Sequence, residues 1–190
     1  MASERLFTLL ERLGNLTQAG LRAAGQAHGL QPVPLLALSY LGKANRYSDT
    51  PAAVAEYLGL SRGATSQTLS LLERRGLLVR TQDSNDRRVW HLALSAAGRA
   101  IVADSLPPQE WKALLAKRGG PADRLEAEFE ALLRTLQVAG GSVSFGVCRT
   151  CRHFLSDAGT RHRCGLTGEP LAVAQTGKLC REHEAPGPPA

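Results

Sequence analysis

Four cysteines in the last quarter of the chain are the residues with the clearest chemical potential. Cys148 and Cys151 are separated by two residues, whereas Cys164 and Cys180 follow singly, and the 190 residues contain no other cysteine. Two intervening residues let the sulfurs of the first pair reach one centre. Four thiolates form a complete set of soft ligands for tetrahedral zinc or for an iron–sulfur cluster. The pattern predicts one metal site with all four cysteines as ligands.

Three interpretations of these cysteines remain open. The first is an iron–sulfur cluster, 2Fe–2S or 4Fe–4S, because positive charge near the thiolates would offset the negative charge of a cluster. The second is structural zinc, although the separation of Cys164 from Cys180 weakens a zinc-ribbon assignment. The third is a set of metal-free redox thiols. The arginines nearest the cysteines are Arg149, Arg152, Arg161, Arg163 and Arg181.

Three histidines also lie near cysteines in the sequence. His153, His162 and His183 could each replace one thiolate and give a mixed-ligand site. Histidines in such positions more often lie outside the ligand set or face solvent, so the four cysteines remain the predicted ligands.

Composition favours a nucleic-acid partner. Lys and Arg total 23 against 17 Asp and Glu, which gives a net charge of +6 and a pI near 9.5. Such a balance suits polyanionic partners. The first 30 residues carry charges among their leucines, so they lack the unbroken apolar segment of a signal peptide or membrane span. We expect a cytoplasmic protein, in which disulfides are disfavoured.

Helical spacing of apolar residues predicts the elements that come first. An amphipathic helix fits residues 2–27, and a second fits 33–43 after prolines that a first turn tolerates. A short helix follows from Pro51, capped by Ser48 or Asp49 and ended by Gly59.

The next helix is predicted to carry a polar, slender outer face. It runs from Arg62 to about Arg75 after Ser61 as cap, and Gly76 stops it. One stripe of this helix points inward, while the rest points out. The inward residues are Thr65, Thr68, Leu69 and Leu72, and the outward ones are Arg62, Gly63, Ser66, Gln67, Ser70 and Arg74.

A basic-tipped hairpin and further helices complete the predicted main domain. Strands at 77–81 and 89–94 flank the turn-prone run Asp83–Asp86, with Arg87 and Arg88 at the return. Ser95 caps a helix, a segment around Trp111 follows two prolines, and a last helix runs from Pro121 to Val138.

Glycines mark the predicted end of this domain. We expect a DNA-binding and dimerisation domain over 1–139, a small irregular four-cysteine module over 140–184 and a disordered Pro/Gly-rich tail over 185–190. The predicted fold class is mainly α with a small β-hairpin wing.

A short helix, a turn and a second helix with small outer residues are typical of a helix-turn-helix, because only a slender helix surface approaches base edges in the major groove. The hairpin makes it winged. Arginines at its tip can enter the minor groove or neutralise phosphates.

Four runs then resemble the MarR family of winged-helix regulators, in that family's order: Ser61-Arg-Gly-Ala-Thr-Ser-Gln-Thr-Leu, Leu72-Glu-Arg-Arg-Gly-Leu-Leu, Asp83-Ser-Asn-Asp-Arg-Arg and Leu92-Ala-Leu-Ser-Ala-Ala-Gly. The resemblance extends over roughly 3–139. It implies a homodimer, built from the first and last helices of this region, that reads a palindromic operator in double-stranded DNA. It also implies contacts to bases and phosphates from Ser61, Arg62, Gly63, Ser66, Gln67, Ser70, Arg87 and Arg88.

The leading hypothesis is a transcriptional regulator, a repressor by family resemblance, whose DNA affinity depends on an iron–sulfur cluster as a redox, oxygen or iron sensor. The alternative is a regulator that responds to a small aromatic effector, with the cysteines holding structural zinc. No nucleophile, base and orienting group occur together, and no phosphate-cradling glycine loop follows a strand, so we do not expect an enzyme.

Overall fold

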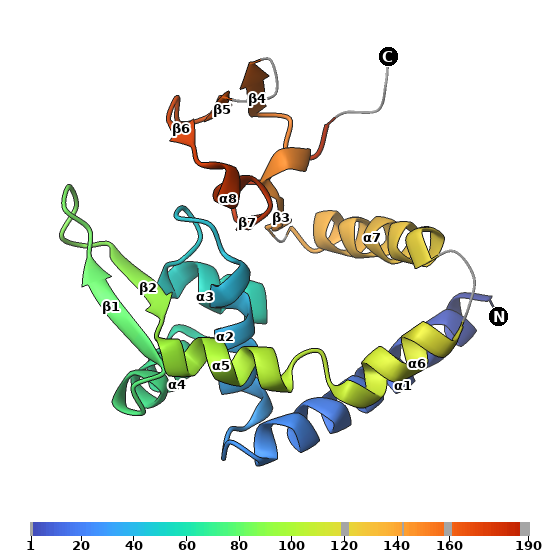
Figure 1. Cartoon of the computed structure of the whole chain (residues 1–190). Helices are drawn as coiled ribbons and strands as arrows, with labels where there is room; N and C mark the ends of the chain where they lie inside the picture. Colours follow the sequence, from blue (N-terminus) through green and yellow to red (C-terminus); the bar gives the residue numbers. More distant parts are fainter. Residues whose placement is uncertain (1, 119–121, 142, 158–160, 187–190) are drawn as a thin grey trace.

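The computed structural model describes residues 2–118, 122–141, 143–157 and 161–186. Figure 1 shows a core of helices with a protruding hairpin, two long helical arms and a small separate C-terminal module. The elements are α1 (Ala2–Gln26), α2 (Pro32–Lys43), α3 (Pro51–Leu58), α4 (Arg62–Arg74), β1 (Leu78–Gln82), β2 (Trp90–Leu94), α5 (Ala96–Ser105), α6 (Gln109–Arg118), α7 (Ala122–Ala139), β3 (Gly146–Val147), η1 (Cys148–Thr150), β4 (Phe154–Asp157), β5 (Arg161–Cys164), β6 (Pro170–Leu171), α8 (Val173–Thr176) and β7 (Leu179–Cys180).

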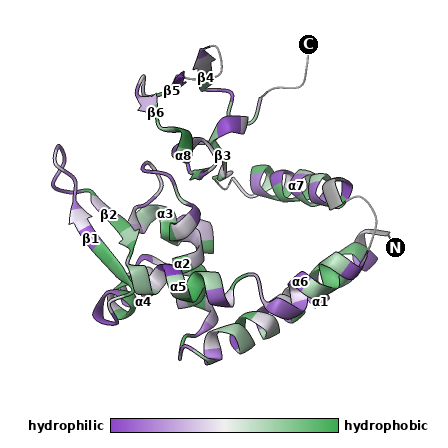
Figure 2. Ribbon diagram, in the orientation of Figure 1, coloured by the Kyte–Doolittle hydropathy of each residue, from purple (hydrophilic) through white to green (hydrophobic). Residues whose placement is uncertain are grey.

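The hydrophobic core lies where α2 meets α3, α4, α5 and the base of the hairpin. Leu35, Leu38 and Tyr40 of α2 are completely or almost completely buried, as are Leu69 and Leu72 of α4. Figure 2 shows hydrophobic ribbon gathered along these facing elements. The predicted inward stripe of α4 is confirmed in this way, and the mainly helical fold with a small hairpin wing is confirmed with it.

The helix caps follow local rules with one correction. Ser61 accepts the Ala64 N–H at the start of α4, and Ser95 accepts the Gly98 N–H at the start of α5, both as predicted. The predicted cap of α3 by Ser48 or Asp49 is wrong. Thr50 caps this helix, because Pro51 takes the first helical position and the residue before it is the cap.

The wing is a regular antiparallel hairpin. Its register runs from Leu78 opposite Leu94 to Gln82 opposite Trp90. At the turn, one carboxylate oxygen of Asp83 accepts the backbone N–H groups of Asn85 and Asp86 at 2.7 and 2.8 Å. This bond pair fixes the conformation of the wing tip, because it satisfies donors that the strand ladder leaves unpaired.

Helices α1, α6 and α7 carry apolar side chains that are exposed in the single chain. Trp111 of α6 packs beside Gly20 of α1, where a Cβ atom would lie 3.0 Å from the indole nitrogen. Elsewhere these arms are open, and Figure 1 shows them projecting from the core. The exposed apolar residues are Leu6, Phe7, Leu9, Leu13 and Leu16 of α1, Leu114 and Leu115 of α6, and Phe129, Leu133, Leu136 and Val138 of α7.

The C-terminal module is more regular than the predicted irregular one. Strand β3 pairs with β7, and β4, β5 and β6 form a three-stranded antiparallel sheet. Leu171, Cys148, Cys180 and His183 are its buried residues. The strands are two to four residues long, so few apolar side chains are available to hold them.

Phe145 anchors this module to the core. Its backbone has φ of 45°, a left-handed conformation that a bulky residue adopts only when its surroundings impose it. The ring lies edge-on to Tyr40 and Tyr57, with centroids 5.9 and 5.2 Å away. Phe145 and Leu179 both pack against the main core cluster. The predicted disordered tail, 185–190, lies largely outside the described residues.

Among the residues described, no helix is long and apolar enough to cross a membrane.

Candidate functional site

The outer face of α4 presents small polar residues to solvent. Arg62, Gly63, Ser66 and Gln67 are exposed, and Ser70 is half-buried. A groove of about 310 Å³ lies between α3 and α4, with Arg62, Ser66 and Arg80 in its lining. This surface is slender, mainly uncharged in its middle and flanked by guanidinium groups.

Arg80 is a residue of this surface that our sequence reasoning missed. Its guanidinium lies 3.1 Å from the Glu73 carboxylate at the end of α4, although the angle is too poor for a proper hydrogen bond. In a strand, residues two apart face the same side. Because Leu78 is buried against α4, that alternation was a signal that could have placed Arg80 beside the same helix.

The two wing arginines differ in their surroundings. Arg88 makes a two-point ion pair with the Asp86 carboxylate, with distances of 3.0 and 2.9 Å, although its side chain is 90% exposed. The guanidinium of Arg87 is exposed and has no polar partner among the described residues. Arg87 therefore offers the less compensated charge at the wing tip.

The four cysteines converge on one small cavity. Cys148, Cys151, Cys164 and Cys180 all line a space of about 40 Å³, together with Tyr47, His153, Phe154, Leu166, Thr167, Leu171 and Glu182. All four are free thiols. The backbone N–H of Glu184 donates to the Cys151 sulfur at 3.4 Å. Cys164 and Cys180, which lie 16 and 32 positions after Cys148, thus line the same cavity as Cys148 and Cys151, and their role as metal ligands stays a prediction.

Burial controls the protonation of two of these thiols. Burial, and then the neighbouring thiols, raise the pKa of Cys148 to about 11. Burial also raises the pKa of Cys180, against the lowering effect of hydrogen bonds from the Asn45 side chain and the Glu182 backbone. Both groups are therefore protonated at neutral pH without a cation, which makes them poor redox nucleophiles.

The donor set suits a metal ion, with one reservation in its geometry. No three His, Cys, Asp or Glu side chains in the described part of the chain already form an arrangement that could hold an ion. Asn45 Nδ2 is buried and makes no hydrogen bond of good geometry, and its proximity lowers the pKa of Cys180.

Comparison with known proteins identifies the main domain. Residues 28–89 match the sequence model of the MarR family, which covers α2, α3, α4, β1 and the wing turn and ends before β2. This segment is similar to the MarR family, and its fold is a winged helix. Proteins of that family are transcription regulators and not enzymes, which supports the prediction that the chain is not an enzyme.

Individual relatives of the MarR-family segment agree with the fold. The transcriptional repressor MprA of Escherichia coli K12 is 33% identical over 95 residues, which are 47% of this chain and 54% of that protein. The chain thus spans about half the length of this relative. CouR of Rhodococcus jostii RHA1, bound to p-coumaroyl-CoA, has a TM-score of 0.57 at 24% identity over 73% of this chain and 94% of its own. The structure of Streptococcus pneumoniae FabT in complex with DNA has a TM-score of 0.56 at 23% sequence identity, over 74% of this chain and 99% of its own.

The histidines near the cysteines have other partners. His153 lines the cavity, but its Nε2 lies 3.2 Å from the Glu184 carboxylate. His162 stacks on Phe154 and pairs with Ser156. His183 is buried with Nε2 against Thr150, and burial lowers its pKa. The four-thiol set predicted from the sequence therefore remains the best candidate.

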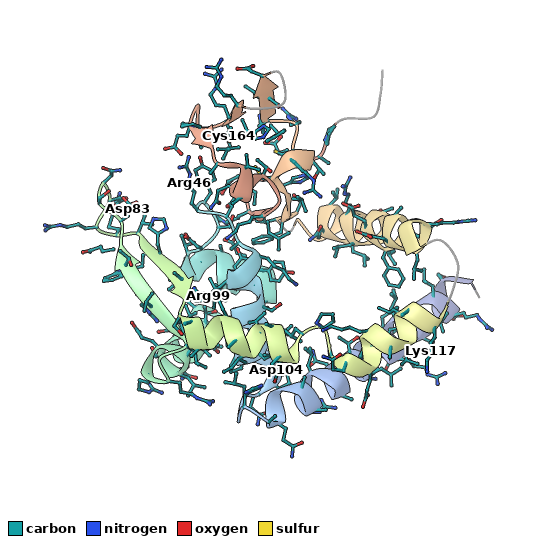
Figure 3. All side chains as sticks on the ribbon, viewed as in Figure 1. Arg46, Asp83, Arg99, Asp104, Lys117 and Cys164 are labelled. Atoms are coloured by element: carbon teal, nitrogen blue, oxygen red, sulfur yellow. The ribbon has the colours of Figure 1, made fainter. Side chains whose placement is uncertain are left out.

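The cysteine module is docked on the loop between α2 and α3 of the winged-helix core. The Asn45 N–H donates to the Leu179 carbonyl at 2.9 Å, and the Arg181 N–H donates to Ser48 Oγ at 2.7 Å. Arg46 reaches out from the core to Glu169, 2.8 Å away, beside the strands that carry Cys164; Figure 3 labels Arg46 and Cys164. This loop, 44–49, is defined here as the docking loop. Sequence reasoning did not find it, because its partners lie more than 120 residues away.

Proposed function

We propose that the protein is a DNA-binding transcription regulator. The observation that carries this proposal is the exposed face of α4, whose small polar residues follow Arg62, together with the exposed wing arginines Arg87 and Arg88. Slender polar helices of this kind enter the major groove, and exposed guanidinium groups bind phosphates or guanine. The relatives support the proposal, since one is a repressor and another is solved with DNA.

The protein acts as a homodimer on a palindromic operator. Apolar side chains on α1, α6 and α7, such as Phe7, Leu115 and Phe129, are about half exposed or more. Contiguous surfaces of that kind mark interaction sites in soluble domains. A second copy of the chain would cover them and would place two α4 helices on successive turns of DNA.

DNA binding is tested by selection from a random-sequence duplex library, followed by fluorescence anisotropy at several salt concentrations. We expect enrichment of a palindrome and weaker binding at high salt. A Gln67→Ala variant should lose discrimination more than overall affinity, whereas Asp157→Ala in the module serves as a control. Failure to enrich any sequence would contradict the proposal.

The four cysteines hold a metal centre that regulates this activity. The spacing first favoured an iron–sulfur cluster, but the short strands of the module need a cross-link, which is the role of structural zinc. A single tetrahedral zinc ion fits the donor set best. When bound, it would hold four thiolates together and cross-link strands that are too short to be stable alone.

The metal is identified by assaying zinc, iron and acid-labile sulfide in protein purified without oxygen. One zinc per chain and no colour is the expected result. Iron with sulfide and a visible band would restore the iron–sulfur sensor, and protein that takes up neither would contradict a metal centre.

A second candidate function is response to a small effector. A cavity of about 480 Å³ lies between the end of α2, the base of the wing and α5, and Lys178 and Gln175 of the module form one side. Arg99 and Lys178 give it positive charge beside the apolar Leu92, Val102 and Leu106. It would accept a small apolar anion. Aromatic carboxylates should raise the thermal stability of the parent protein but not that of Arg99→Ala; equal shifts would contradict this candidate.

A further inference from the structure

A continuous set of side-chain and backbone contacts runs from the cysteine cavity to the tip of the wing. At the cavity end, Asn45 is 1% exposed and its amide nitrogen lies against the Cys180 sulfur. The side-chain oxygen of Asn45, Oδ1, accepts a hydrogen bond from the Ser48 hydroxyl at 2.8 Å. Ser48 Oγ in turn accepts the backbone N–H of Arg181, the residue after Cys180. The docking loop therefore contacts Cys180 through Asn45 and the residue after Cys180 through Ser48.

The same loop also holds the wing. The Asp49 carbonyl accepts the Leu92 N–H at 2.7 Å, and the Asp49 carboxylate lies 2.6 Å from His91 Nδ1. The other ring nitrogen of His91 lies 3.1 Å from the Asp83 carboxylate. Asp83 is the residue that fixes the wing turn through the N–H groups of Asn85 and Asp86.

We infer that the docking loop transmits the state of the four-cysteine site to the wing through Asn45, Ser48, Asp49 and His91. This inference rests on the proposed function and names the route of its regulation. Because the residues on both sides of Cys180 are hydrogen-bonded to the docking loop, a metal that draws Cys180 into a shared ligand set would also act on Asn45 and Ser48. Tyr40 donates its hydroxyl to the Ser48 carbonyl at 2.7 Å, which anchors this end of the loop to the core.

The contacts make such movement consequential for the wing. Ser48 and Asn45 are buried, so their hydrogen bonds are costly to leave unmade. A displaced Ser48 carries the adjacent Asp49 with it. The contact between the Asp49 carboxylate and His91 then shifts or breaks. Because His91 also contacts Asp83 in the wing turn, the turn that carries Arg87 and Arg88 changes its position relative to α4. Wing geometry decides which phosphates these arginines can reach.

Trp90 provides a direct optical readout. It lies beside His91 in β2, opposite Gln82, and is 41% exposed. The other tryptophan, Trp111, lies in α6, so a Trp111→Phe background isolates the wing signal. The experiment adds zinc ions alone to reduced, metal-free full-length protein and records Trp90 emission and quenching, with zinc uptake measured in parallel by a chromophoric competitor.

The discriminating variant is His91→Phe, which keeps a bulky ring in the strand and removes both carboxylate contacts. Its matched control is His28→Phe, which breaks the comparable 2.8 Å pair between His28 and Asp104 on another part of the core. Figure 3 labels Asp83 and Asp104, which lie in different parts of the molecule. Asp49→Asn provides a second, milder break.

We expect zinc to shift Trp90 emission in the background protein and in His28→Phe, and the shift to disappear in His91→Phe while zinc uptake is unchanged. A full shift in His91→Phe would overturn the inference. So would zinc uptake without any Trp90 response, although DNA affinity could still respond through the dimer helices and leave the proposed function standing. Absence of zinc uptake would overturn the metal centre and this inference together.

Discussion

Arg181 and Glu56, 125 residues apart in the chain, are joined by a two-point ion pair, with guanidinium nitrogens 2.5 and 2.7 Å from the two carboxylate oxygens. Glu56 lies in α3, the first helix of the helix-turn-helix, and Arg181 follows directly after Cys180. The last cysteine is therefore tied to the DNA-reading core by side chains as well as by the backbone.

Removing this pair should loosen the module without unfolding the core. Both side chains are about one third exposed, so solvent screens the pair, and we expect Arg181→Ala to cost on the order of 1 kcal/mol of docking free energy. Hydrogen exchange of the Asn45 amide, which donates to Leu179, should speed up by roughly fivefold. Arg152→Ala, which breaks a pair within the module, is the control; equal acceleration there would show that the effect is nonspecific.

The two wing arginines should contribute unequally to DNA binding. Arg87→Ala should lower the slope of log affinity against log salt by about 0.9, because one phosphate contact is lost. Arg88→Ala should have a smaller effect, since Asp86 already compensates its charge. Removing that carboxylate in Asp86→Asn should strengthen binding. Anisotropy at several salt concentrations measures all three, and a larger loss from Arg88→Ala than from Arg87→Ala would contradict the assignment.

Stability should depend on pH through His91. The hydrogen bond to Asp49, and then that to Asp83, raise the pKa of His91 above its usual 6.5. Protonated His91 therefore adds to the free energy of unfolding. This contribution is complete below pH 6.5, the usual value, and is lost as the pH rises through the pKa of the folded state. Denaturant unfolding between pH about 6 and about 8.5 should show that fall in the parent protein and in His28→Phe. If the free energy of unfolding of His91→Phe fell by the same amount over this pH range, the pH dependence would belong to another group.

Metal affinity should increase with pH. Burial holds the pKa of Cys148 at about 11, so a cation must displace that proton when it binds. Zinc competition assays at increasing pH should therefore give tighter apparent binding up to that range. Cys164→Ser should no longer bind one zinc per chain, while its helical circular dichroism signal persists. His153→Ala should still bind one zinc per chain. Zinc retained by Cys164→Ser would remove that thiol from the ligand set.

Local signals in the sequence predicted the parts of this fold that neighbouring residues determine. Ser61 and Ser95 were predictable as caps because a cap bonds only to N–H groups two or three positions ahead. The misassignment of Ser48 was avoidable by a local rule, since Pro51 takes the first helical position and Thr50 before it is the cap. The actual role of the Ser48 hydroxyl was not predictable, because its partner Arg181 lies 133 positions away.

The candidate sites divide in the same way. Cysteine type and spacing predicted one shared metal site, and the structure brings the four thiols to one cavity; the metal itself stays a prediction. The docking loop could not be foreseen, since Asn45 and Asp49 are ordinary loop residues whose roles arise from tertiary contacts with Cys180 and His91.

The most direct test of metal-controlled DNA binding is the affinity of one protein preparation for its selected duplex, measured by anisotropy when stripped of metal and again after reloading with zinc. We expect the two affinities to differ by about fivefold or more, a typical coupling between two sites, and Cys164→Ser to show no difference. Equal affinities of the stripped and zinc-loaded parent protein would contradict regulation by the four-cysteine site.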